Sequence, residues 1–130
     1  MRIAATVSRI LLGLLFLVAG ASGFFFIANP PPAPPGLAGQ FQDIFFASRW
    51  VLFVDGVEFV AAVLLLANRF VPIALLLLAG VLPNILVFHI TMMPMGIFPG
   101  LIATLLWFVV ALQYRSLFAP LFVARASIDR

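Results

Sequence analysis

Four long apolar segments, separated by short polar or proline-rich segments, follow one another along this 130-residue chain. A helix needs about 20 mostly apolar residues to cross the hydrocarbon core of a bilayer. Each apolar segment is about that long, so we predict an all-α, polytopic membrane protein with a four-transmembrane-helix bundle. The prediction is a single membrane domain, residues 1–130, with spans at about 10–28, 48–68, 71–90 and 97–114.

The first apolar segment has a second interpretation. It follows a basic start, and Ala19-Gly20-Ala21 resembles the small-residue site at which a signal peptide is cleaved. The apolar run continues past that site as Phe24–Ile27, which favours a membrane span. The segment also has a stripe of small residues that would let another helix approach closely, namely Gly13, Gly20 and Gly23.

A proline-rich loop, 29–47, separates the first two predicted spans. Five prolines in six residues, Pro30–Pro35, cannot continue a helix and favour an extended backbone. The second half of the loop, Leu37–Ala47, is mildly amphipathic. We predict that it forms a lid or a short helix at the membrane interface.

Composition excludes several classes of protein. The chain is 65% hydrophobic and only 8% charged, so a soluble domain of this length could not bury its apolar surface. The net charge of +3 comes from scattered arginines rather than from a basic patch, which argues against nucleic acid as a partner. The chain has no cysteine, which excludes thiol exchange and thiolate ligation by its own residues.

The arginines predict the orientation in the membrane. Four spans place both termini on one side, and that side holds six of the seven arginines, while the other side holds only Arg49. Because basic loops stay in the cytoplasm, we expect both termini to be cytoplasmic and the proline-rich loop to face outward. The predicted location is the cytoplasmic (inner) membrane, in contact with the lipid bilayer.

Two acids, Asp55 and Glu58, lie inside the second predicted span. A carboxyl group at the centre of a membrane helix costs about 2.5 to 3.5 kcal/mol, so both side chains should face a bundle interior or a wet cavity. Their spacing of three residues puts them on one helical face. They are candidates for proton handling or ligand binding, with one acid held neutral by burial. Alternatively, they join helices through hydrogen bonds.

The third predicted span adds two polar candidates, Asn84 and His89. With about 1.5 Å of rise per residue, both share the outer half of the membrane with Asp55, while Glu58 lies near the middle. The two are about 140° apart around their helix, so we expect Asn84 rather than His89 to meet the helix with the acids. Gly80, one turn earlier, would permit that close approach. His89 alone is more typical of an interfacial or structural histidine.

Motifs for self-contained catalysis are absent from the sequence. One histidine and two carboxylates without ligand spacing do not predict a metal site. The chain also lacks a glycine-rich phosphate loop and a nucleophile motif, so we do not expect a self-contained enzyme.

The segments Leu64–Leu75 and Pro83–Ile90 resemble the DoxX-like family of small four-helix membrane proteins, as do the basic start and the stretch from Tyr114. The resemblance implies a bacterial inner-membrane protein. Some relatives belong to membrane redox systems, including a thiosulfate:quinone oxidoreductase. Family members often carry an acid in the second helix, which Glu58 matches, whereas Asp55 has no counterpart in that pattern.

Three functional hypotheses follow. The first is an accessory subunit of a membrane redox system, with a redox partner protein and a quinone or similar apolar ligand held near Asp55, Glu58, Asn84 and His89. The second is a non-catalytic scaffold or homo-oligomer in which the acids join helices. The third, a small transporter, fits less well, because the prolines of the third span have no clear counterpart in the first half.

Overall fold

The computed structural model describes residues 1–125 and 127–128, and this part of the chain is helical without a strand. Its α-helices and 3₁₀ helices, in chain order, are α1 (Arg2–Phe26), α2 (Leu37–Ala47), α3 (Trp50–Leu66), α4 (Val71–Met92), η1 (Pro94–Gly96), α5 (Ile97–Gln113), α6 (Arg115–Phe118) and η2 (Ala119–Phe122).

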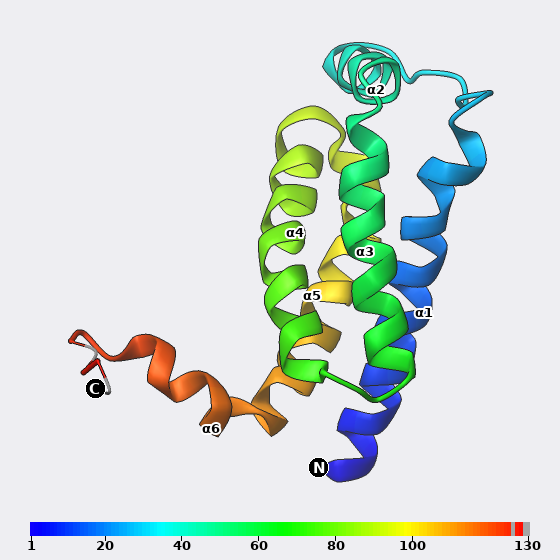
Figure 1. Cartoon of the computed structure of the whole chain (residues 1–130). Helices are drawn as coiled ribbons and strands as arrows, with labels where there is room; N and C mark the ends of the chain where they lie inside the picture. Colours follow the sequence, from blue (N-terminus) through cyan, green and yellow to red (C-terminus); the bar gives the residue numbers. More distant parts are fainter. Residues whose placement is uncertain (126, 129–130) are drawn as a thin grey trace.

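Four long helices, α1, α3, α4 and α5, run side by side as a bundle, and the short helix α2 lies across one end of it (Figure 1). The chain starts at the opposite end, where α6 also lies and leads away from the bundle (Figure 1). The 3-residue 3₁₀ helix η1 turns the chain between α4 and α5. This arrangement puts the start of α1 and the end of α5 at the same end of the bundle, because four long helices run alternately up and down (Figure 1).

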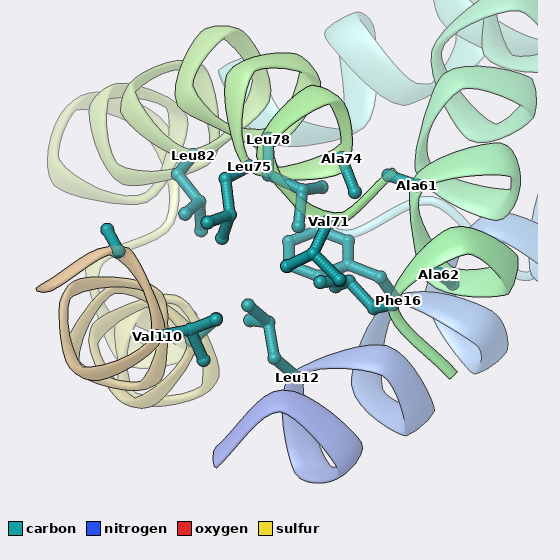
Figure 2. Packing of buried hydrophobic residues seen from close by; sticks show 13 residues of the cluster. Leu12, Phe16, Ala61, Ala62, Val71, Ala74, Leu75, Leu78, Leu82 and Val110 are labelled. Atoms are coloured by element: carbon teal, nitrogen blue, oxygen red, sulfur yellow. The ribbon is translucent and has the colours of Figure 1, made fainter. Parts of the chain in front are cut away.

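The bundle core is made of leucines, valines and alanines from all four long helices, together with one phenylalanine, Phe16. Figure 2 shows Leu12 and Phe16 of α1 directed toward α4, where Leu75 and Leu78 are fully buried. Small residues of α3, such as Ala61, let the helix backbones come close at this level. This core lies nearer the end at which the chain starts, and it leaves the other end of the α3–α4 pair open for a cavity.

Three segments are long and apolar enough to cross a membrane, and these are Arg2–Phe26, Val71–Met92 and Pro94–Gln113. The prediction of several membrane-spanning helices is therefore confirmed, and the chain is a multi-pass membrane protein in contact with lipid. Helix α3 has 17 residues, as many as α5, but α5 is extended by η1 to a 20-residue segment, whereas α3 has no such extension; α3 includes both acids. A crossing by α3 stays a prediction.

Helix α1 begins at Arg2, eight residues before the predicted first span, and the start of the membrane-spanning part stays a prediction. Arginine, alanine and isoleucine are compatible with a helix, so the basic start continues the helix instead of preceding it. The Arg9 guanidinium donates a hydrogen bond to the Leu65 carbonyl near the end of α3, which also accepts from the Asn68 backbone N–H. Helix α1 ends at Phe26, just before the proline run.

The segment predicted as a loop, 29–47, contains a helix over its second half. Helix α2 spans Leu37–Ala47, the same bounds as the predicted lid or short helix. The proline run keeps the first half non-helical, and Gly36 begins the helix with a φ of 79°, a conformation that glycine adopts without strain. A left-handed residue, Arg49 with φ 63°, then separates α2 from α3, so α3 begins two residues later than predicted.

The stripe of small residues on α1 lets another helix approach closely, as predicted, and the structure shows that this helix is α3. A Cβ atom at Gly13 would lie 2.8 Å from a Leu66 side-chain carbon. A Cβ atom at Gly20 would lie 2.5 Å from the Phe59 backbone nitrogen and 2.7 Å from the Asp55 carbonyl oxygen. Backbone cannot move aside as a flexible side chain can, so Gly20 marks the point where the two helices are closest.

A further link joins α4 to α5. The Trp107 indole N–H donates a hydrogen bond to the Leu75 carbonyl oxygen at 2.9 Å. Indole needs a partner for its N–H when it is removed from water, and the helix backbone supplies one. This bond fixes the position of α5 against the buried part of α4, below the cavity described next.

Candidate functional site

A cavity of about 750 Å³ lies between α3 and α4 and beneath α2. This volume is within the usual range of about 300–1,000 Å³ for small-molecule sites. Most of its lining is aromatic or aliphatic, and four of the lining residues are the predicted candidates Asp55, Glu58, Asn84 and His89. The structure therefore brings all four sequence-predicted residues to one cavity.

Helix α2 closes the cavity from the end of the bundle with an aromatic surface. Phe41 stacks on Phe45 with ring centroids 5.3 Å apart, and Phe45 meets Trp50 of α3 edge-to-face at 5.5 Å. Phe41 also contacts Phe88 of α4, with centroids 5.2 Å apart. These contacts attach α2 to both walls of the cavity, as the lid prediction required.

The cavity opens sideways between α3 and α4. Phe53 and Val87 both line it, yet 70% and 58% of their surfaces are exposed. Phe53 is one turn into α3, and Val87 is in the last third of α4. Residues that are both lining and exposed mark a mouth, and this mouth lies on the flank of the bundle rather than at its end.

Glu58 is the acid without a protein partner. Its side chain is only 6% exposed and borders the cavity. None of the side-chain hydrogen bonds in the part of the chain that the structure describes involves Glu58. An acid removed from water needs a hydrogen-bond partner, because an unsatisfied polar group is costly in an apolar environment. The carboxyl group of Glu58 is thus directed to a space in which another molecule could be that partner.

Asp55 is held differently, although it is only three residues away. It is 7% exposed, and its Oδ2 accepts a hydrogen bond of 2.6 Å from the Gly23 backbone N–H and a longer one, 3.4 Å, from the Ser22 hydroxyl. Both donors belong to α1. Asp55 therefore joins α3 to α1. It also borders the cavity, but its Oδ2 is already occupied by donors of α1.

Two backbone groups of α1 have side-chain partners at this contact. In a regular helix the Gly23 N–H would pair with the Ala19 carbonyl four residues earlier. Here each of the two groups has a side-chain partner, since the Ser22 hydroxyl also donates to the Ala19 carbonyl at 2.7 Å. A side chain at position 23 would collide with the Asp55 carboxyl group, so only glycine fits there.

Asn84 does not pack against α3, and the close approach predicted at Gly80 was wrong. A Cβ atom added to Gly80 would have no neighbour within 4 Å, because the cavity separates α3 from α4 at this level. The Asn84 side-chain amide instead donates to the Gly80 carbonyl at 2.7 Å on its own helix. Its side-chain oxygen stays available at the cavity wall.

His89 lines the upper part of the same cavity. Its Nδ1 is 3.1 Å from the Met93 carbonyl oxygen, which orients the ring and leaves Nε2 on its other edge. Asn84 and His89 both reach the cavity, although they point in different directions from α4, because the lining extends along α4 from Leu77 to Met92. Among the described residues, no group of three or more histidine, cysteine or acidic side chains could hold a metal ion.

Sequence reasoning missed Ser22 and Gly23 as partners of Asp55, and it did not identify the aromatic residues that line the cavity. The small-residue stripe on α1 was the signal that could have predicted the contact between Asp55 and α1. Close helix approach exposes backbone N–H groups to a neighbouring side chain, so an acid on the facing helix could have been assigned to the stripe. The phenylalanines of α2 were a weaker signal for the cavity, because phenylalanine is frequent throughout the chain.

Comparison with known proteins identifies the family to which the chain belongs. No curated protein and no solved structure matches the chain. The family model DoxX matches residues 4–91, which include α1 almost completely and the three helices that line the cavity. All four candidate residues lie inside the matched region. Because the match covers well over half of the sequence, the chain belongs to the DoxX family.

Proposed function

We propose that this DoxX-family protein binds a quinone, or an apolar ligand with a similar polar head, in the cavity between α3 and α4, as an accessory subunit of a membrane redox system. The observation that carries the proposal is Glu58, a residue only 6% exposed whose carboxyl oxygens have no protein partner and remain accessible at the wall of an aromatic cavity. Ligand carbonyl or hydroxyl groups would satisfy that carboxyl, and the aromatic walls would hold a ring.

The position of the mouth supports an apolar ligand. Such molecules concentrate in the bilayer, and the exposed residues Phe53 and Val87 border an opening on the flank that would face lipid. A mouth that faces lipid requires α3 to lie in the membrane, so we propose that α3 is the fourth crossing helix. We also propose that the membrane is the cytoplasmic (inner) membrane of a bacterium and that both termini are cytoplasmic. Six of seven arginines near the termini and the α3–α4 turn favour that orientation.

Each polar side chain then has a stated task. Glu58 donates a hydrogen bond or a proton to one ligand oxygen. The free oxygen of the Asn84 amide and Nε2 of His89 complete the polar surroundings of the head group, and Phe41 and Phe45 close the site against water. Electrons would come from a redox partner protein.

The test is the quinone content of the purified protein. We would purify the protein in mild detergent, extract it with solvent, and quantify quinone by absorbance and mass spectrometry, for the native chain, Glu58→Gln and Asp55→Asn. We expect near-stoichiometric quinone in the native protein and in Asp55→Asn, and quinone lost in Glu58→Gln at an unchanged melting temperature. Quinone at the level of the surrounding lipid in the native protein would refute the proposal.

A second function, a non-catalytic scaffold or homo-oligomer, is favoured by the geometry of Asp55. Its bonds to α1 are those of a side chain that joins helices, and they need no ligand. Under this alternative Glu58 contributes in the same way to a contact with another chain. Glu58→Gln would then lower the melting temperature or dissociate an oligomer, whereas ligand binding predicts neither change.

A further inference from the structure

A second, smaller cavity lies at the end of the bundle where the chain starts. Its volume is about 220 Å³, and it is bordered by α1, by the turn between α3 and α4, and by the last turn of α5. Four of its lining residues come from one face of α1, at the helical spacing of three, four and seven residues, and these are Arg2, Ala5, Thr6 and Arg9. The cavity is therefore formed between helices that pack against one another, and α1 supplies half of its lining residues.

The lining combines two guanidinium groups with neutral polar side chains. Asn68 and Gln113 offer amides, and Tyr114 and Thr6 offer hydroxyls. Buried Ala5 and Val110 form the apolar part. Among the described residues, the acids are Asp43, Asp55 and Glu58, which belong to α2 and to the first half of α3, toward the other end of the bundle.

Arg9 is held in place at this cavity. Its guanidinium donates one hydrogen bond to the Leu65 carbonyl, so the side chain is positioned before any ligand arrives. A guanidinium has five N–H donors in a rigid fork, which leaves donors that can bind a phosphate in bidentate fashion. Arg2 lies about two turns earlier on the same face, about 10 Å along the axis, so the two arginines could hold an anionic group between them.

We propose that this cavity binds a phosphate group, with Arg2 and Arg9 as the charged contacts and Asn68 and Gln113 as neutral donors. A phosphate at this position has two sources, the head group of an anionic phospholipid in the adjacent leaflet or a soluble phosphate. The apolar side formed by Ala5 and Val110 suits a lipid, and basic pockets between membrane helices bind such head groups. The proposal is independent of the quinone site, which is at the other end.

The experiment measures binding to the native protein in neutral detergent. The probes are short-chain phosphatidylglycerol, short-chain phosphatidylcholine and inorganic phosphate, followed by native mass spectrometry and by the shift in melting temperature. The variants are Arg2→Gln and Asn68→Gly, since glycine keeps the left-handed conformation of position 68, where φ is 54°. The matched control is Arg69→Gln, which removes the same charge from the neighbouring turn residue, outside the cavity lining.

We expect phosphatidylglycerol to bind more tightly than phosphatidylcholine, and Arg2→Gln to weaken it about tenfold, as for loss of one charge-assisted hydrogen bond. Asn68→Gly should weaken it less, and Arg69→Gln should leave it unchanged. Inorganic phosphate that binds as tightly as the lipid, with the same dependence on Arg2, would support the site and assign it to a soluble anion. Equal effects of Arg2→Gln and Arg69→Gln would show general electrostatic attraction and overturn the proposal.

Discussion

The backbone N–H of Gly23 donates a 2.6 Å hydrogen bond to Oδ2 of Asp55, so an acid of α3 is held by the main chain of α1. The contact exists because glycine has no side chain to keep the helices apart. It gives Asp55 a structural partner, while its neighbour Glu58 has none among the described residues. Two acids on one helical face thus have distinct surroundings, one at a helix contact and one at a cavity.

Replacing Asp55 should separate its hydrogen-bonding capacity from its charge. Asp55→Asn keeps a side-chain oxygen for the Gly23 N–H, so we expect a loss of less than about 1 kcal/mol of stability. Asp55→Ala leaves that N–H without its partner and opens a small void, and should lower the free energy of unfolding by about 1–3 kcal/mol. Thermal unfolding in detergent measures both, and equal losses would contradict a role based on acceptance from Gly23.

The closest point between α1 and α3 predicts an unusual sensitivity at Gly20. Gly20→Ala places a Cβ atom against the α3 backbone, which must move away, so we expect a loss of about 1–3 kcal/mol. The control is Gly56→Ala on α3, where the added Cβ would lie 3.8 Å from the Phe24 ring. There alanine favours the helix by about 0.5–1 kcal/mol. If Gly20→Ala and Gly56→Ala shifted the melting temperature in the same direction, the close contact between Gly20 and the α3 backbone would be ruled out.

The aromatic surface of α2 should contribute to ligand affinity. Phe45→Ala removes an aromatic side chain from the cavity lining and its ring contacts with Phe41, Phe46 and Trp50, so we expect quinone affinity to fall by about 1 kcal/mol, or roughly fivefold. Ile44→Ala is the matched control, because Ile44 is the preceding residue on α2, is 66% exposed and does not line the cavity. Titration with a short-chain quinone checks both variants, and the same affinity in the two would remove α2 from the site.

The hydrogen bond from the Trp107 indole N–H to the Leu75 carbonyl should stabilise the protein, so removing that donor should lower the free energy of unfolding. Trp107→Phe keeps an aromatic ring but leaves the Leu75 carbonyl without the indole N–H, so we expect a loss of about 1 kcal/mol. Phe108→Leu, at an exposed neighbouring position, should change stability by less than about 0.5 kcal/mol. Unfolding monitored by circular dichroism distinguishes the two, and a stable Trp107→Phe protein would make the bond dispensable.

The bundle could be predicted because apolar segments of this length have few alternatives, and the resemblance to the DoxX-like family pointed to the family that the match confirmed. Helix α2 was predicted with its observed bounds because Gly36 and the proline run define its start. The extension of α1 to Arg2 could not be predicted, because a basic segment looks like a flank in sequence, while Arg9 has a partner on α3 that only the fold reveals.

The candidate site was predictable in its residues but not in its shape. Asp55, Glu58, Asn84 and His89 were recognised because polar groups are costly in lipid, and all four line one cavity. The space between α3 and α4 could not be predicted, since Gly80 favours close packing when only sequence is considered. Whether two helices use a glycine for contact depends on the neighbours of both, and here α2 inserts aromatic rings above the gap.

The unequal lengths of the helices have a consequence for the surrounding bilayer. Helix α3 has 17 residues and is about 25 Å long, whereas the hydrocarbon core is about 30 Å thick. A crossing helix that is too short creates hydrophobic mismatch, which a bilayer relieves by local thinning. Beside α3 this would bring the water boundary down toward α2 and the mouth of the cavity. Glu58 would then exchange protons over a shorter path than its place in the middle of α3 suggests, and membrane thickness would tune that exchange.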